Sequence, residues 1–240
     1  MEELYRLNKY LSDSGVCSRR AADAAIEAGE VTVNGQLAVM GMKVTASDEV
    51  RYKGQLVSNV GKKNILLAYN KPAGIVCTAE KREKNNIIEH INYPERIYPV
   101  GRLDKDSTGL ILLTNQGDLV NKIMKAVNAH EKEYIVTVDK DITGDFIKNM
   151  SSGVYLEELD VTTRKCKVTK TGPREFKIIL TQGLNRQIRR MCQAFGYRVR
   201  TLKRIRIMNI ELGNLKEDTY RDVNSKEIKE LMKMLEGSKN

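Results

Sequence analysis

The segment GRLDKDSTGLILLT, residues 101–114, decides what fold and function we expect around it. Polar side chains from Arg102 to Thr108 lead directly into LILLT (110–114), an apolar run that is typical of a buried strand. Side chains at the end of a core strand are held rigidly, as a reacting group must be. The segment therefore favours a functional centre placed at the start of a buried strand.

Three other interpretations of this segment compete with a reacting centre. A simple capping turn that feeds the strand stays open on local sequence alone. A calcium loop would start at Asp104, but its twelfth position is Asn115 rather than glutamate and its later positions fall in the apolar strand. The run DKDST (104–108) resembles the haloacid-dehalogenase phosphatase motif, in which a hydrophobic strand precedes the aspartate and a helix follows. Here Gly101 and Arg102 precede it and a strand follows, so the phosphatase hypothesis ranks low.

Apolar patterns outside this segment predict many strands and few helices, which is typical of an α+β fold with a mixed, largely antiparallel sheet. A hairpin is expected to turn near Thr171-Gly172, and a helix near Asp118 should have an apolar face that extends to Val127. The expected strands are 65–69, 110–114, 134–138, 160–169, 174–181 and stretches within 198–212, and the other expected helices are 146–150, 185–195 and 226–235.

The first 52 residues form a smaller unit by the same patterns. Ser18 suits the N-cap of a helix over 19–28, and Asn34-Gly35 is typical of a hairpin turn. The polar run KGQLVSNVGKK (53–63) resembles a linker. We therefore expect a small domain at 1–52, a linker at 53–63 and a larger domain at 64–240.

Composition restricts the class of protein and its partners. The 240 residues include 41 Lys+Arg against 31 Asp+Glu, a net charge of +10 that suits a polyanionic partner. The four cysteines lie far apart without a CxxC pair, and there are two histidines, so we expect neither a disulfide framework nor a metal site. Since no apolar run reaches membrane-spanning length and the N-terminus is charged, we expect a cytoplasmic protein without membrane association.

The basic excess is concentrated between Thr181 and Arg206, where eight Lys/Arg residues occur without any Asp or Glu. Three of the arginines are expected in the first turns of a helix, where the macrodipole disfavours each cation by about 0.3–1 kcal/mol. An anionic ligand would explain them. Later in the stretch, Arg204 and Arg206 alternate and should share one strand face that grips phosphate. Arg19 and Arg20 repeat the helix-start pattern in the small unit, near Arg6 and Lys9.

Four motifs give the chain a family resemblance. In the family's order along the chain, NKPAG (70–74), GRLDKDSTGLILLT (101–114), KEYIV (132–136) and LNRQIRRM (184–191) resemble the motifs of pseudouridine synthases of the RsuA type. Residues 6–52 resemble an S4 RNA-binding domain. AHEKEYIVTVDKDIT (129–143), RKCKV (164–168) and RIMNI (206–210) are most similar to the RluF branch. The resemblance implies an S4 domain followed by a pseudouridine synthase domain, acting on 23S ribosomal RNA and, in some members, on a transfer RNA.

The resemblance also implies roles for individual residues. Asp104 matches the nucleophile, Arg189 its salt-bridge partner and Tyr134 the aromatic ring that packs on the extruded base. Arg102 matches the arginine that fills the gap left by that base, whereas Lys71 and Gln187 suit either the RNA backbone or the architecture. The residues expected to contact RNA are thus Arg6, Lys9, Arg19, Arg20, Lys71, Arg102, Arg186, Gln187, Arg190, Arg204 and Arg206.

The implied reaction moves the ribose from N1 to C5 of uracil without a redox change. It needs no cofactor, and the sequence has no GxGxxG or P-loop motif that would bind one. Three routes stay open for Asp104: attack on the ribose, attack on the base, or assistance to elimination. The alternative function is a non-catalytic S4 protein that assists ribosome assembly. The intact GRLD, KEY and QIRRM segments favour the enzyme, because a binding module has no need of a carboxylate in a basic cleft.

Overall fold

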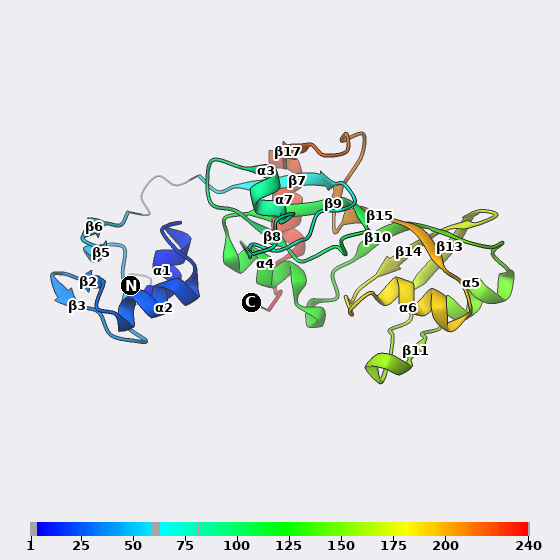
Figure 1. Cartoon of the computed structure of the whole chain (residues 1–240), viewed down its shortest axis with the longest axis horizontal. Coiled ribbons are helices and arrows are strands. Elements are labelled where there is room, and N and C mark those ends of the chain that lie inside the picture. The colour runs from blue at the N-terminus through cyan, green and yellow to red at the C-terminus, as the bar shows by residue number, and fades with distance from the viewer. Residues whose placement is uncertain (1–3, 59–62, 81, 240) are drawn as a thin grey trace. The chain divides into compact units, whose positions relative to one another are not determined.

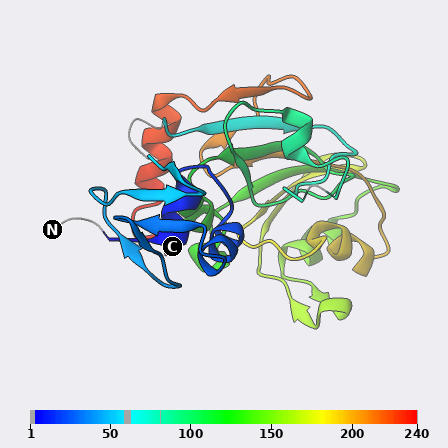
Figure 2. The same cartoon turned by 60° about the vertical axis from the view of Figure 1, so that its left-hand side comes forward.

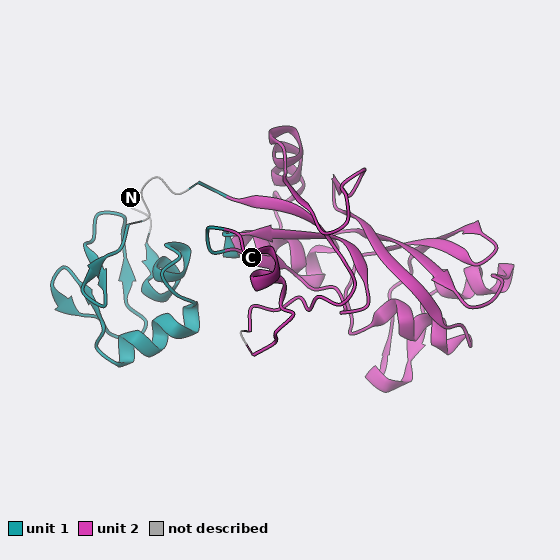
Figure 3. Ribbon diagram, turned by 45° about the horizontal axis from the view of Figure 1, so that its top comes forward, with its two compact units in different colours: residues 1–64, 94–96, 115–117 teal, residues 65–93, 97–114, 118–240 magenta. Residues whose placement is uncertain are grey.

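The computed structural model of the chain describes residues 4–58, 63–80 and 82–239. Two compact units are present (Figure 3): Met1–Asn64 with Pro94–Arg96 and Asn115–Gly117, and Ile65–Tyr93 with Ile97–Thr114 and Asp118–Asn240. No helix within the described ranges is both long enough and apolar enough to cross a bilayer.

The smaller unit packs two helices against short antiparallel strands. Ser18 caps the second helix, since its side chain accepts a hydrogen bond from the backbone N–H of Ala21. Its core contains Leu7, Leu11, Val31 and Val50, all almost completely buried. The elements are β1 (Tyr5–Arg6), α1 (Leu7–Asp13), α2 (Arg19–Glu27), β2 (Val31–Val33), β3 (Gln36–Leu37), β4 (Lys43–Val44), β5 (Val50–Tyr52) and β6 (Gln55–Leu56), with β3-β2-β5-β6 as one sheet and β1-β4 as another.

The segment predicted as a linker begins too early at residue 53. Lys53 and Gly54, both with positive φ, form a tight turn that brings β6 back against β5. Val57 is buried in the core of the small unit. The polar composition of 53–56 thus belongs to a hairpin, and residues 59–62 of the predicted linker lie outside the described residues.

The larger unit is built on a mixed sheet (Figure 1) with the order β13-β14-β10-β15-β9-β7-β17. Within the described residues, β9 and β15 pair in parallel and the other pairs of this sheet are antiparallel, so the predicted α+β class and mixed sheet are confirmed. The strands are β7 (Leu66–Lys71), β8 (Tyr98–Val100), β9 (Thr108–Thr114), β10 (Lys132–Val138), β13 (Lys167–Gly172), β14 (Glu175–Leu180), β15 (Val199–Ile207), β16 (Ile210–Glu211) and β17 (Tyr220–Asp222).

Helices cover both faces of this sheet. Ile123 of α4 and Leu231 of α7 join one apolar cluster with Leu110 and Leu112, while Phe146 of α5 and Met191 of α6 join the other. In Figures 1 and 2, α7 (red) and α6 (gold) lie at different ends of the sheet. The remaining elements are α3 (Ile87–Ile91), α4 (Gly117–Met124), α5 (Gly144–Ser151), α6 (Gln187–Ala194), α7 (Ser225–Met234), the 3₁₀ turns Ala126–Asn128 and Glu157–Leu159, and the strand pair β11 (Tyr155–Leu156) and β12 (Val161–Thr162).

Two sequence-based expectations for elements of this unit were wrong. The helix near Asp118 ends at Met124, and Val127 lies 61% exposed in the following 3₁₀ turn rather than on an apolar helix face. The first strand of the predicted hairpin begins at Lys167, because Val161–Thr162 pair with β11 instead. Short apolar runs carry too little periodicity to separate such small elements from their neighbours.

The parallel contact between β9 and β15 depends on Gly109. A Cβ atom at this position would lie 2.2 Å from the backbone oxygen of Arg204, and φ is +97°. A side chain would therefore push the two strands apart where the register pairs Arg204 with Gly109. The second glycine of the 101–114 segment thus keeps the following strand in contact with β15.

We predict that Gly109→Ala destabilises the protein by about 2–5 kcal/mol, because it combines backbone strain with a steric clash. Gly213→Ala is the matched control: Gly213 also has a positive φ (+54°), but open space surrounds its Cβ position. That variant should lose only about 1 kcal/mol. Urea-induced unfolding of both variants measures the difference, and equal losses would contradict the role assigned to the strand contact.

Candidate active site

A pocket of about 300 Å³ opens on one face of the large sheet. Its floor comes from three neighbouring strands: Lys132 and Tyr134 on β10, Leu180 on β14, and Leu202 and Arg204 on β15. The register places Tyr134 opposite Arg204 and Lys132 opposite Leu180, so these side chains share a face. Since ligand pockets start at about 300 Å³, this space suits a single nucleoside rather than a duplex.

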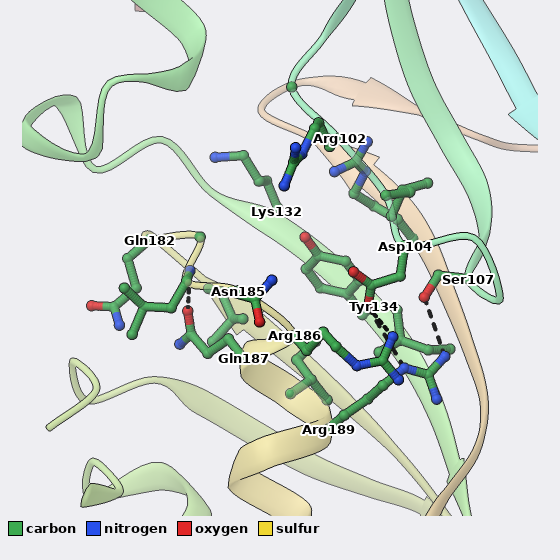
Figure 4. A pocket seen from close by; sticks show the side chains of 18 of the residues that line it. Arg102, Asp104, Ser107, Lys132, Tyr134, Gln182, Asn185, Arg186, Gln187 and Arg189 are labelled. Carbon is green, nitrogen blue, oxygen red and sulfur yellow. Dashed lines mark hydrogen bonds and ion pairs between the residues drawn. The ribbon is translucent and has the colours of Figure 1, made fainter. Parts of the chain in front are cut away.

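The acidic group of the pocket is Asp104, which lies in the loop before β9 (Figure 4). Two arginines of the α6 segment converge on it: Arg189 Nε lies 3.7 Å and Arg186 Nη1 3.8 Å from Asp104 Oδ2. Both also approach Asp106, at 3.8 Å and 3.5 Å. The Asp104 side chain is 30% exposed and that of Arg189 is 15% exposed. The structure thus brings together the carboxylate and the arginine that sequence reasoning paired.

The start of α6 is shaped to present these arginines. Arg186 occupies the N-cap position with a left-handed backbone (φ 48°), which turns the chain sharply before the helix. Gln187 Oε1 accepts a hydrogen bond from the N–H of Leu184 at 3.1 Å and so fixes that turn. On the other wall, Ser107 Oγ accepts a hydrogen bond from Arg189 Nη2 at 3.3 Å, which orients the guanidinium beside Asp104.

Lys71 holds the loop that carries Asp104. Its side chain is completely buried, and Nζ donates to the carbonyl oxygens of Pro72 (2.8 Å), Lys105 (3.3 Å) and Ser107 (2.8 Å). A further hydrogen bond joins the N–H of Gly74 to the same Lys105 oxygen at 2.8 Å. Burial lowers the pKa of Lys71. The NKPAG segment is therefore the anchor of the acidic loop, and an RNA contact by Lys71 is wrong because no part of its side chain reaches the surface.

Lys132 is a pocket residue that sequence reasoning did not single out. It is 5% exposed, and burial, followed by the charge of Arg204, lowers its pKa to about 8. Burial and the charge of Lys132 also lower the pKa of His130. The available signal was the alternation of KEYIV, which places Lys132 on the same strand face as Tyr134.

The expectation that Arg204 and Arg206 share a phosphate-gripping face is wrong. A bulge in β15 pairs Tyr134 with Arg204 but Glu133 with Arg206, so the two arginines project to opposite faces of the sheet. Arg204 is 1% exposed and lines the pocket, where no backbone phosphate reaches it from the surface. Arg206 is bonded to Glu133 and Glu131 at 2.9 Å each.

The remaining residues with expected RNA contacts fall into two groups. Arg102 and Arg186 are exposed and line the pocket. Gln187 is 4% exposed and fixes the turn before α6 through its hydrogen bond with Leu184. Arg190 pairs with Glu158 and with the carbonyl oxygen of Asn185, so a phosphate would have to displace existing partners. In the small unit, Arg6, Arg19 and Arg20 are exposed, and Lys9 lies 3.8 Å from Asp13.

Comparison with known proteins agrees with this geometry. The family model described as RNA pseudouridylate synthase matches residues 65–194, and the S4 domain model matches residues 6–50. The chain is 53% identical over 234 residues to a protein of Escherichia coli strain K12 named dual-specificity RNA pseudouridine synthase RluF, covering 97% of this chain and 80% of that one.

More distant relatives cover a similar extent. The ribosomal large subunit pseudouridine synthase B of Bacillus subtilis is 32% identical over 242 residues, with 98% of each chain covered. A crystal structure of a pseudouridylate synthase superposes with a TM-score of 0.69 at 27% identity, covering 94% of this chain and 99% of that chain. The similarity to these proteins therefore spans both units of the chain.

We predict that Lys71→Met destabilises the protein by roughly 3–5 kcal/mol, because it removes three hydrogen bonds and leaves the carbonyl oxygens of Pro72 and Ser107 without this donor. Lys105→Met is the matched control, since that side chain is exposed and should change stability by less than about 0.5 kcal/mol. Urea-induced unfolding of the full chain measures both. A loss below about 1 kcal/mol for Lys71→Met would show that the buried ammonium is not the anchor of the loop.

Proposed function

The chain belongs to the RNA pseudouridylate synthase family, and we propose that Asp104 is the nucleophile with which this pseudouridine synthase isomerises its target uridine. The observation that carries this assignment is the position of Asp104 in the pocket, within 4 Å of two guanidinium groups. Both charges stabilise the negative carboxylate at these distances. Their separations are longer than hydrogen bonds, so the carboxylate oxygens keep lone pairs for a substrate.

The reaction breaks the N1–C1′ bond of uridine and forms a C5–C1′ bond, with loss of a proton from C5 and gain of a proton at N1. No electrons are exchanged with another molecule, so the chemistry is that of a nucleophilic carboxylate and of groups that stabilise charge. We propose that Arg189 positions Asp104, because its guanidinium is held by Ser107 on one side and lies beside the carboxylate on the other.

The target base must leave its stack to reach a pocket of this size, which costs a few kcal/mol. We propose that Tyr134, whose ring lines the floor and is 9% exposed, packs on the extruded uracil and offsets about 1–3 kcal/mol of this cost. We propose that Arg102, which is exposed and lines the pocket, fills the gap that the base leaves in the RNA. Arg186, exposed at the opposite wall, suits a phosphate next to the flipped nucleotide.

We propose that the substrates are 23S ribosomal RNA and a transfer RNA, and that the protein acts in the cytoplasm. The support is the name of the 53% identical relative, a dual-specificity enzyme, together with the ribosomal name of the Bacillus subtilis relative. The net charge of +10 suits such polyanions. The S4 unit, which continues past residue 52 to Val57, would add a second RNA contact through Arg6, Lys9, Arg19 and Arg20, with catalysis confined to 64–240.

We predict that Asp104→Asn abolishes pseudouridine formation, with a loss of at least about 10³-fold in rate, while RNA affinity stays within several-fold. The substitution keeps the size of the side chain and removes its charge. Single-turnover assays on ribosomal and transfer RNA, with pseudouridine mapped by position, measure the rate. Turnover near that of the wild type would rule out Asp104 as the nucleophile.

We predict that Arg189→Ala lowers the single-turnover rate about 100-fold and changes RNA affinity less than about threefold, because the loss affects the group beside the reacting carboxylate. Arg174→Ala is the control, as Arg174 pairs with Asp141 on the surface, away from the pocket. Its rate should match the wild type. A loss of affinity for Arg189→Ala with an unchanged rate would make Arg189 a phosphate-binding residue instead.

A further inference from the structure

Two buried cations on the pocket floor have no role in the function proposed above. Arg204 is 1% exposed and Lys132 is 5% exposed, and both line the pocket that contains Asp104 and Tyr134. Neither makes an ion pair with a carboxylate within the described ranges. Two buried cations without an ion-pair partner are costly unless a ligand meets them.

The guanidinium of Arg204 is only partly satisfied by the protein. Its Nε donates to the carbonyl oxygen of Leu110 at 2.6 Å, which fixes the side chain between β15 and β9. Its Nη2 is buried and finds no hydrogen-bond partner among the described residues. The register places Arg204 opposite Tyr134, so both residues lie on the same face of the sheet and line the same pocket.

Lys132, on β10, is the second buried cation of the pocket floor. It lies two residues from Tyr134 on the same strand face, and its Nζ donates to the carbonyl oxygen of His130 at 3.3 Å. An ammonium group has three N–H donors, so donors remain for a ligand. In the view of Figure 4, Lys132 and Arg189 appear on opposite sides of the Tyr134 ring.

The depth of these two groups decides which part of an RNA they can meet. Arg102 and Arg186 are exposed at the pocket and reach a sugar-phosphate backbone that passes over it. Arg204 and Lys132 lie beneath, where a flat base that stacks on Tyr134 comes within reach. The acceptors that an extruded uracil presents to N–H donors are its carbonyl oxygens, O2 and O4.

Negative charge develops on those oxygens whichever route Asp104 takes. If the N1–C1′ bond breaks with its electron pair left on the base, the uracil becomes an anion delocalised over N1, O2 and O4. If the carboxylate adds to C6, the electrons of the C5–C6 bond move toward C4 and O4. In both routes, fixed N–H donors at these oxygens stabilise the transition state more than the neutral base.

We propose that Arg204 and Lys132 are catalytic residues that bind the carbonyl oxygens of the target uracil and stabilise the negative charge that the base acquires during isomerisation. This inference rests on the proposed function, because it requires the uracil to lie between Asp104 and Tyr134.

The test is a comparison of single-turnover rate and RNA affinity for Arg204→Met and Lys132→Met, with the RNA that the wild type modifies. We expect each variant to lose about 100-fold in rate, the typical effect of removing one donor to a developing oxyanion, with affinity changed less than threefold. Lys203→Met is the matched control: it removes the same charge from the adjacent residue of β15, which pairs with Ile135 on the opposite face, and should keep the wild-type rate.

Arg204 also joins two strands, so its variant needs a check on folding. Arg204→Lys keeps a cation at this position and should retain more activity than Arg204→Met at equal thermal stability. If Arg204→Met does not fold, Lys132→Met alone decides the proposal. Wild-type rates in both methionine variants would overturn it, as would weaker RNA binding with a salt slope reduced by about one ion, which is the signature of a phosphate contact.

The pH dependence of kcat/KM distinguishes a catalytic role of Lys132 from a structural one. Since its pKa is about 8 in the unbound protein, its positive charge is present below that pH and lost above it. The wild-type kcat/KM should therefore fall as the pH rises through about 8, and Lys132→Arg should move this fall to higher pH. An unchanged profile would overturn the role of Lys132. The charged or titratable groups that line the same pocket are Arg102, Asp104, Tyr134, Arg186, Arg189 and Arg204, and His130 lies two residues before Lys132, just before the start of β10.

The failure of this inference is distinguishable from the failure of the proposed function. If the wild type forms no pseudouridine in either RNA, or Asp104→Asn retains its rate, the proposed function fails before Arg204 is considered. If Asp104→Asn is inactive while Arg204→Met and Lys132→Met turn over like the wild type, only the charged floor is wrong.

Discussion

The buried ammonium of Lys71 is the interaction on which the site depends. Its three carbonyl acceptors belong to Pro72, Lys105 and Ser107, so one side chain joins the end of β7 to the loop that carries Asp104. The loop has no regular structure of its own, and without these bonds the Ser107 oxygen would lose its Lys71 donor and the Lys105 oxygen would keep only the N–H of Gly74. A buried cation with three acceptors is satisfied internally, and it therefore fixes the loop without competing for the carboxylate.

Because the loop is fixed, the long separations of 3.7 and 3.8 Å between Asp104 and its two arginines are a property of the site. Arg189 Nε is buried without a hydrogen bond among the described residues and lies 3.7 Å from the carboxylate, although Ser107 holds the same guanidinium in place. Since both partners are anchored from behind, they cannot close this gap by moving together. The site thus keeps its carboxylate and its arginine near each other with hydrogen-bonding capacity left for the substrate.

Periodicity and turn signals in the sequence predicted the central strands of the sheet but not β8 or β17, and motif resemblance predicted the meeting of Asp104 and Arg189. They could not predict features that depend on a one-residue shift in strand pairing or on contacts between distant parts of the chain. The bulge of β15 separates Arg204 from Arg206, and no local signal in RIRI marks it, because both arginines fit either face until the partner strand is known. Lys71 was ambiguous for a related reason: a lysine after an apolar run suits the surface, and its burial follows from acceptors that lie 34 and 36 residues further along the chain.

The same change of register gives the pocket its chemistry. Had Arg204 and Arg206 shared a face, both would have lain with Glu131 and Glu133, whose carboxylates already neutralise Arg206. The bulge instead turns one arginine toward Tyr134 and leaves its acidic neighbours to the other. Strand β15 thereby supplies Arg206, which two glutamates neutralise, and Arg204, which is buried without an ion pair among the described residues. An unneutralised guanidinium stabilises a charge that appears only during the reaction more than it stabilises the neutral base, and that difference is what accelerates a chemical step.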